Sequence, residues 1–154
     1  MHLAQLNIAR LKYPFEDPRV ADFAANLDRV NGIAERSEGF VWRLQDDGGD
    51  ATGIQAFDDP AVIVNMSVWR DPETLERFVW NTIHKAFYRR RAEWFGLMEA
   101  QHFVMWWVDE RAPPPDLLEA KARLSHLQAH GDSDFAFGWA YLPHVKLWQQ
   151  ARCA

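Results

Sequence analysis

Hydrophobic and polar residues alternate near the start of the chain, as they do in a β-strand with one buried face. Leu6 and Ile8 alternate with Gln5 and Asn7, and a period of two residues is typical of a half-buried strand. Three later segments are short and rich in Val, Phe, Trp and Met. The predicted strands cover residues 3–9, 40–45, 62–69 and 102–108.

Three longer segments repeat their hydrophobic residues every three or four positions, which is typical of amphipathic helices. Each begins at an aspartate, namely Asp17, Asp71 or Asp116. An aspartate carboxylate caps a helix by accepting backbone N–H groups, and proline, which follows the first two, fits the first helical position. The predicted helices cover residues 18–36, 73–97 and 116–130, and the second can break near Asn81-Thr82.

The order of these elements, β-α-β-β-α-β and then a helix, predicts an α+β fold. It is the ferredoxin-like order, in which an antiparallel four-stranded sheet carries two helices on one face. The other face also carries apolar residues, so we expect a second copy to cover it and to form a homodimer, a dimeric α+β barrel. The expected domain covers residues 1–137, including the helix at 116–130, and residues 138–154 form a C-terminal tail.

Composition narrows the range of partners. The chain has 154 residues, enough for one domain, and a formal net charge of −5, whereas proteins that bind nucleic acid need a basic face. The charge also argues against an anionic membrane surface, and no apolar run is long enough to span a bilayer. The N-terminal residues do not resemble a signal peptide, and the lone Cys153 excludes an internal disulfide, so we expect a cytoplasmic protein.

Aromatic residues are the unusual component, at 14 % of the chain with eight tryptophans. Such an excess belongs to packed cores, interfaces or ligand pockets. The segment 62–95 is rich in aromatic residues and contains one histidine, His84. Imidazole exchanges protons near neutral pH or ligates a metal, although a hydrogen-bonded structural histidine is an equally good interpretation. The hypothesis is an aromatic pocket with His84 in its wall.

Other polar residues occur where apolar ones are expected. Asn7 and Asn65 lie in predicted strands, where asparagine is unfavourable, so each implies a specific partner, which is a ligand, water or backbone. On the predicted second helix, Arg90 falls within the apolar stripe and Arg91 on its edge. A guanidinium there needs a carboxylate, a carbonyl or an anionic ligand, and a structural ion pair is the plainer alternative.

The tryptophans are candidates for both the pocket and the core. Adjacent Trp106 and Trp107 must point to opposite faces of their strand, so we expect one to line a cavity beside the helices and the other to lie between the sheets of a dimer. The sequence contains no Gly-rich phosphate loop, no Ser-His-Asp arrangement and no pattern of metal ligands, so no metal site is predicted.

Several of these residues together resemble a known superfamily. They are Asn7, the segments 39–44 and 65–69, His84, and the segment 90–95. With the order of elements, they resemble the dimeric α+β barrel superfamily, which includes antibiotic-biosynthesis monooxygenases and haem-degrading monooxygenases. Within it, the likeness is greater to an uncharacterised bacterial family, a domain of unknown function, and it covers residues 1 to 137.

The resemblance implies a site inside each protomer, between the sheet and the helices. It implies a monooxygenase-like enzyme without a cofactor that acts on a hydrophobic, aromatic small molecule. His84 would act as acid and base, while Asn7 and Arg91 would orient oxygen atoms of the substrate. The predicted substrate-binding residues are Asn7, Trp42, Asn65, Trp69, Tyr88, Arg90, Arg91 and Trp94.

Two alternatives remain open. In the first, the protein binds haem with His84 as the axial ligand. The haem degraders place their haem-binding histidine about one turn later, where this chain has Tyr88. In the second, the protein is a non-catalytic module for ligand binding or dimerisation, and its tryptophans are purely structural.

Overall fold

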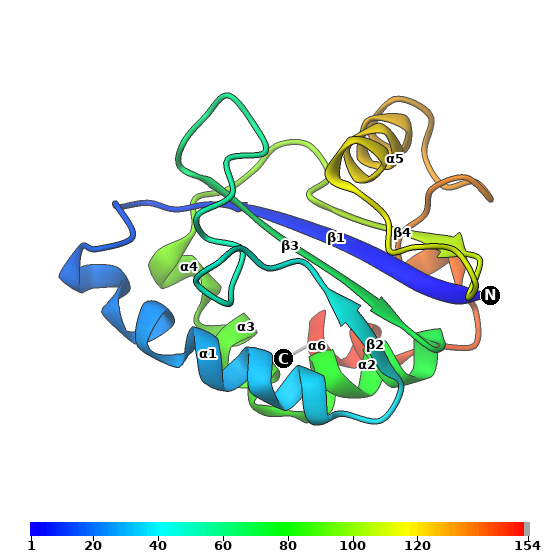
Figure 1. Cartoon of the computed structure of the whole chain (residues 1–154), viewed down its shortest axis with the longest axis horizontal. Helices are drawn as coiled ribbons and strands as arrows, with labels where there is room; N and C mark the ends of the chain where they lie inside the picture. Colours follow the sequence, from blue (N-terminus) through cyan, green and yellow to red (C-terminus); the bar gives the residue numbers. More distant parts are fainter. Residues whose placement is uncertain (153–154) are drawn as a thin grey trace.

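The centre of the molecule is one antiparallel sheet. The structure, a computed structural model, describes residues 1–152, so Cys153 lies outside the described residues. The strand order is β2-β3-β1-β4, and each strand runs antiparallel to its neighbours (Figure 1). The strands are β1 (His2–Arg10), β2 (Phe40–Arg43), β3 (Val62–Trp69) and β4 (Phe103–Val108). All the predicted strands are present, and the fold is a mixed α+β fold.

Helices accompany the sheet on both sides. The α-helices are α1 (Ala21–Arg36), α2 (Pro72–Asn81), α3 (Ile83–Arg89), α4 (Arg91–Trp94), α5 (Leu117–His130) and α6 (Leu147–Arg152), and the 3₁₀-helices are η1 (Pro18–Val20) and η2 (Trp139–Tyr141). The predicted caps are confirmed, because the carboxylates of Asp17, Asp71 and Asp116 each accept a backbone N–H from the turn that follows.

Thr82 interrupts the helix that was predicted over residues 73–97. Its backbone is extended, with φ −119° and ψ −173°. Its hydroxyl donates to the Phe78 carbonyl at 2.5 Å and accepts the N–H of His84 at 3.2 Å, so it ends α2 and caps α3. Arg90 makes a second interruption, between α3 and α4. The predicted break near residues 81–82 is confirmed. Residues before and after it belong to different helices, so one helical projection cannot assign the faces of both.

The sheet separates two layers of helices. Figure 1 shows α1, α2 and α3 on one side of the sheet and α5 on the other. On the α5 side, Ala4, Leu6 and Ile8 of β1 pack against α5 and against residues between 44 and 57. These three side chains are at most 4 % exposed. Helix α5 and the 44–57 segment of the same chain therefore bury these side chains.

Trp106 and Trp107 point to opposite faces of β4, as adjacent residues of a strand must. Trp106 is fully buried in the core under α5. Trp107 lies on the other face, where its ring centroid is 5.8 Å from that of Phe137. The expected position of the pair is corrected, because Trp106 packs inside one chain instead of between two sheets.

The C-terminal segment packs against the rest of the domain. Phe137 makes two backbone hydrogen bonds with Met105, at 2.8 and 3.0 Å, which form an isolated antiparallel bridge. Val145 is buried in the core on the side of the sheet that carries α1 and α2. The buried carboxylate of Glu76 in α2 accepts the N–H of Leu147, the first residue of α6. Residues 138–152 are therefore anchored to α2.

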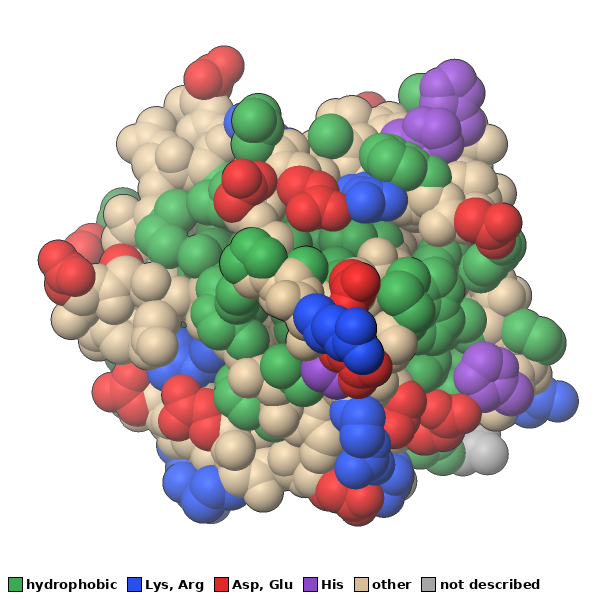
Figure 2. Space-filling model, turned by 45° about the vertical axis from the view of Figure 1, so that its right-hand side comes forward, with side chains coloured by type: hydrophobic (Ala, Val, Ile, Leu, Met, Phe, Trp, Pro, Cys, Tyr) green, Lys and Arg blue, Asp and Glu red, His purple; other side chains and the backbone are tan. Residues whose placement is uncertain are grey.

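Charged side chains of both signs are interspersed on the surface. On the face shown in Figure 2, acidic and basic side chains lie next to one another, with hydrophobic side chains between them. Glu38, for example, pairs with Arg70 at 3.0 Å and with Arg77 at 3.2 Å. Among the helices formed by residues 1–152, none combines the length and the hydrophobicity that crossing a bilayer requires.

Candidate functional site

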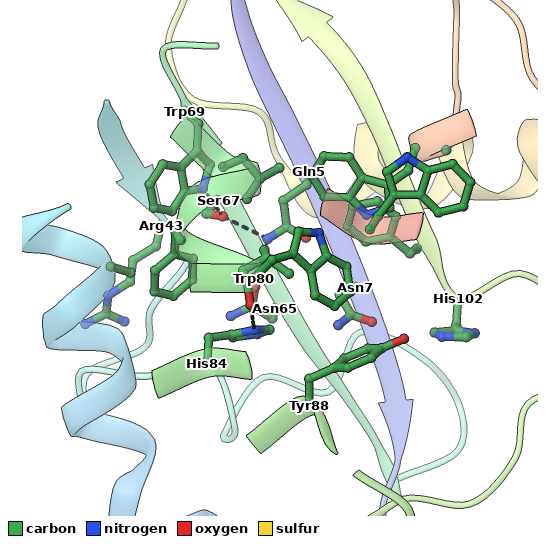
Figure 3. A pocket seen from close by; sticks show the side chains of 18 of the residues that line it. Gln5, Asn7, Arg43, Asn65, Ser67, Trp69, Trp80, His84, Tyr88 and His102 are labelled. Atoms are coloured by element: carbon green, nitrogen blue, oxygen red, sulfur yellow. Dashed lines mark hydrogen bonds between the residues drawn. The ribbon is translucent and has the colours of Figure 1, made fainter. Parts of the chain in front are cut away.

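A cavity of about 460 Å³ lies between the sheet and the helices α1, α2 and α3 (Figure 3). Its volume falls within the range of small-molecule sites, roughly 300–1,000 Å³. Strands β1 and β3 form its floor, and residues of the C-terminal segment 138–148 contribute to its wall.

Four polar side chains form the floor of the cavity. In the antiparallel register, Gln5 lies opposite Ser67 and Asn7 lies opposite Asn65, so all four share one face of the sheet. Nε2 of Gln5 donates to Oδ1 of Asn65 and to Oγ of Ser67, both at 2.8 Å. Within the described part of the chain, the Asn7 amide has no hydrogen-bond partner. Asn65 is exposed although its strand is central, which shows that the helices do not close over it.

Ser67 acts as a hydrogen-bond acceptor at this floor. Its Oγ accepts from Nε2 of Gln5 at 2.8 Å and from Nε1 of Trp69 at 2.9 Å. A hydroxyl oxygen has two lone pairs, and these two bonds occupy both of them. Ser67 is therefore poorly suited to act as a nucleophile, and its hydroxyl proton is the group that remains for a ligand.

Aromatic side chains form much of the walls. The aromatic residues that line the cavity are Phe40, Trp69, Phe78, Trp80, Tyr88, Phe103, Trp139 and Trp148. The rings of Trp69 and Phe78 stack with centroids 5.1 Å apart, and Tyr88 meets Trp80 edge-on at 4.9 Å. The Nε1 of Trp80 is buried and has no hydrogen-bond partner in the part of the chain that the structure describes. These walls suit a flat apolar molecule with polar atoms at its edge.

His84 reaches the cavity from the first turn of α3. Its Nδ1 lies 3.2 Å from the carbonyl oxygen of Val79, and because a carbonyl only accepts, Nδ1 carries the proton of the neutral ring. Nε2 then holds the lone pair, and no described residue hydrogen-bonds to it. Burial lowers the pKa of His84 below its ordinary value of 6.5, although the bond to Val79 opposes this shift. The neutral, proton-accepting form therefore prevails at neutral pH.

The lowered pKa of His84 predicts a specific loss of stability in mild acid. As the pH falls below 6.5, the unfolded chain takes up a proton at this ring before the folded chain does, so the free energy of unfolding decreases until the folded pKa is reached. Urea unfolding at a series of pH values should show this slope in the wild type and not in His84→Asn. The lowered pKa values of Glu38 and Asp59 act only in stronger acid, because their ordinary values are 4.5 and 3.8.

A control variant makes this measurement specific. Arg77 is an exposed arginine that pairs with Glu38 away from the cavity and stays charged in mild acid, so Arg77→Gln should keep the wild-type slope. An identical slope in wild type and His84→Asn would show that the ring of His84 is not responsible.

Arg43 brings a positive charge to the cavity, and a bulge in β2 places it there. The pairing of β2 with β3 shifts by one residue between Phe40 and Trp42, and Arg43 is then opposite Ser67. A bulge changes the alternation of side chains along a strand. As a result, Phe40 and Arg43 both line the cavity, whereas Trp42 packs against the core under α5.

Some of the predicted site residues meet in this cavity, and others lie elsewhere. Those that line it are Asn7, Asn65, Trp69, His84 and Tyr88. Those outside it are Trp42, Arg90, Arg91 and Trp94. Figure 3 shows Asn7 and Asn65 on the sheet side and His84 and Tyr88 on the helix side of the same space.

Local contacts explain why the end of the predicted helix does not reach the cavity. Arg90 pairs at the surface with Asp22, at 2.9 Å, which is the ion pair considered as the alternative. The guanidinium of Arg91 lies 3.9 Å from the centre of the Tyr88 ring and donates to the Tyr88 carbonyl. Trp94 is 1 % exposed and belongs to a separate core cluster. These three positions are corrected from substrate-binding to structural.

Sequence reasoning missed several residues that line the cavity. Gln5 was visible as a polar residue on the same strand face as Asn7, two positions away. Arg43 could not be placed without knowledge of the bulge. His102 and Trp139 reach the cavity through tertiary packing of the segments that carry them. Among residues 1–152, no group of three or more His, Cys, Asp or Glu side chains is placed to hold a metal ion.

Comparisons with known proteins give a family but no activity. The model of a family described as "Domain of unknown function (DUF3291)" matches residues 2–153. No curated protein matches the chain. Among solved structures, the chain is similar to the crystal structure of PA3566 from Pseudomonas aeruginosa, with 18 % identity and a TM-score of 0.45, over 72 % of this chain and 95 % of that chain.

Proposed function

We propose that this chain, which belongs to the family described as DUF3291, is an enzyme that removes a proton from a flat, largely apolar organic molecule. The observation that carries the proposal is the arrangement of His84 and the carboxamides of Gln5, Asn7 and Asn65, which line one cavity within one chain. The cavity combines a neutral imidazole, hydrogen-bonding amides and aromatic walls, which is the combination that such a reaction needs.

The aromatic walls and the amide floor have separate roles in binding. The stacked pair Phe103–Trp139 and the ring of Tyr88 are only partly buried and offer ring surfaces to a flat molecule. The free amide of Asn7 offers hydrogen bonds to polar atoms at its edge. A fully apolar molecule would leave this amide unsatisfied. The substrate is therefore flat, with oxygen or nitrogen atoms at its rim.

His84 supplies the chemistry. Nε2 accepts the proton of an acidic C–H group, and a carboxamide donor at the floor stabilises the negative charge that appears on a neighbouring oxygen. In the monooxygenase-like form of the reaction, the carbanion reacts with molecular oxygen. One CH₂ group becomes a carbonyl, and the second oxygen atom leaves as water, so the substrate supplies the electrons and no cofactor is required.

Native mass spectrometry of the freshly purified protein tests the binding part of this proposal. We expect a small aromatic molecule to remain bound, or aromatic compounds from a thermal-shift panel to raise the midpoint of unfolding. The spectrum also reports the oligomeric state. A protein that carries no molecule and responds to no aromatic compound would contradict an enzyme of this kind and would favour a purely structural module.

The wider architecture supports part of the resemblance. The strand order β2-β3-β1-β4, with α1 and α2 on the same side of the sheet, supports a ferredoxin-like arrangement. A barrel formed by two facing sheets has less support, because α5 occupies the face that the partner sheet would need. We therefore propose an active unit that is complete in one chain.

Haem binding is the second candidate function, and one observation favours it. A histidine whose Nδ1 proton is held by a backbone carbonyl presents Nε2 in the form that ligates a metal. Addition of haem to the purified protein tests this candidate. A Soret band that is shifted and sharpened relative to free haem, and that returns to the free-haem position in His84→Ala, would assign the ring to iron. A wild-type spectrum identical to that of free haem would exclude haem ligation by His84.

A further inference from the structure

Arg43 carries hydrogen-bond donors that the protein itself does not satisfy. Only 11 % of its side chain is exposed, and its Nε donates to Oε1 of Glu35 at 2.8 Å. Its Nη1 and Nη2 groups have no acceptor among the described residues, and the side chain lines the cavity. A nearly buried guanidinium requires water or an anion for its remaining N–H groups. This requirement is a second, independent indication of what the cavity binds.

The sheet register places other donors beside this guanidinium. Arg43 is opposite Ser67 on β3, and Ser67 is opposite Gln5 on β1, so the three residues form one row across the floor. Residues that are directly opposite have Cβ atoms about 5 Å apart. Because both lone pairs of Ser67 are occupied, its hydroxyl proton is available to the same bound group. The row therefore has a cation, Arg43, at one end and a hydroxyl donor, Ser67, next to it.

The position of Arg43 at one end of the cavity defines an orientation. In Figure 3, Arg43 lies beside α1 at one end of the cavity and His102 lies at the other end. His84 lies between them, on α3. A planar group with two oxygen atoms fits the two-pronged Nη edge of a guanidinium, which binds carboxylates in this manner. The ring of the same molecule would then extend along the aromatic walls past His84.

We propose that the molecule bound in the cavity is a flat aromatic carboxylic acid whose carboxylate docks on the Nη edge of Arg43. The inference rests on the proposed function, because it names the chemical class of the molecule on which His84 acts. It adds a specificity-determining residue that lies outside the proton-transfer step. Glu35 holds the guanidinium through Nε and leaves its other edge for the substrate.

Two probes of nearly identical shape test the inference. The first is 2-naphthoate, which carries a carboxylate, and the second is 2-naphthamide, which is neutral; ligand-observed NMR titration gives the dissociation constant of each. In the wild type we expect 2-naphthoate to bind about tenfold more tightly or better, because a charge-assisted bidentate pair is stronger than a neutral hydrogen bond. In Arg43→Gln we expect this preference to disappear while 2-naphthamide binds as before.

Control variants separate the roles of charge, fold and cavity. Arg77→Gln changes an exposed arginine that pairs with Glu38 away from the cavity, and it should keep the wild-type preference. If Arg43→Gln does not fold, Glu35→Gln replaces it, because loss of the competing carboxylate should strengthen binding of 2-naphthoate and not of 2-naphthamide.

The outcomes distinguish this inference from the proposed function. Equal affinity of the wild type for both probes would overturn the assignment of a carboxylate and leave the cavity proposal standing. An unchanged preference in Arg43→Gln, or an unaltered affinity for 2-naphthoate in Glu35→Gln, would also overturn it. If neither probe binds the wild type, both the inference and the proposed function fail.

Discussion

Replacement of His84 by alanine is expected to slow proton abstraction in the cavity by about 100- to 10,000-fold, the usual contribution of one general base. The reason is that Nε2 of this ring is the proposed proton acceptor, since Nδ1 is held by the Val79 carbonyl. The probe is 5-nitrobenzisoxazole, a flat carbon acid. Loss of its C–H proton breaks the ring N–O bond and releases a coloured cyanophenolate, so the rate above buffer is measured by absorbance.

A second variant separates catalysis from structure. In His84→Asn the side-chain amide keeps an N–H near the position of Nδ1, so the bond to Val79 is retained, but no base remains. We expect this variant to be as slow as His84→Ala and to unfold in urea like the wild type at neutral pH. The wild-type rate should persist below pH 6.5, because burial lowers the pKa of His84. Equal rates in the three proteins would remove His84 from the mechanism.

The largest expected effect on stability is that of Trp69→Ala. Trp69 is fully buried, and its ring packs against Phe40 at 5.6 Å and Phe78 at 5.1 Å. Its Nε1 also donates to Ser67 at 2.9 Å. Truncation of a buried tryptophan removes these contacts and leaves a void, so we expect the free energy of unfolding in urea to fall by about 3–5 kcal/mol.

The matched variant Trp69→Phe divides this loss between packing and hydrogen bonding. Phenylalanine keeps a ring against Phe78 but removes the donor to Ser67, so we expect a smaller loss of about 1–2 kcal/mol. Both variants should also weaken binding of any ligand found in the cavity, because Trp69 lines it. A loss below about 1 kcal/mol in Trp69→Ala would mean that the indole is not part of a tightly packed core.

The elements of this fold are largely predictable because their signals are local. Asp71 followed by Pro72 marks the start of α2 in the sequence, and the Asp71 carboxylate accepts the N–H of Thr74 in the structure. The predicted limits of β3, residues 62–69, coincide with the observed ones. Asn7 and Asn65 were singled out as unfavourable strand residues, and they face each other on the cavity floor.

The features that could not be predicted depend on single residues that interrupt a strand or a helix and so change which side chains face the cavity. Regular alternation in β2 would place Phe40 and Trp42 on one face, but the bulge between them exchanges Trp42 for Arg43 at the cavity. The break at Thr82 similarly changes the direction of the chain, so one helical projection does not describe both α2 and α3. Arg90 and Arg91, which were assigned to the site from that projection, lie outside the cavity. The packing of residues 138–148 against the cavity depends on contacts between distant parts of the chain, which no local pattern contains.

One face of β1 packs in the core and the other lines the cavity, which has a consequence for how the protein can evolve. Leu6 and Ile8 point into the core beneath α5, whereas Gln5 and Asn7 point into the cavity. Core packing and the proposed site thus occupy alternate positions of this part of the strand. A lineage, or a mutant library, can exchange Gln5 and Asn7 to acquire a new specificity while Leu6 and Ile8 preserve the fold.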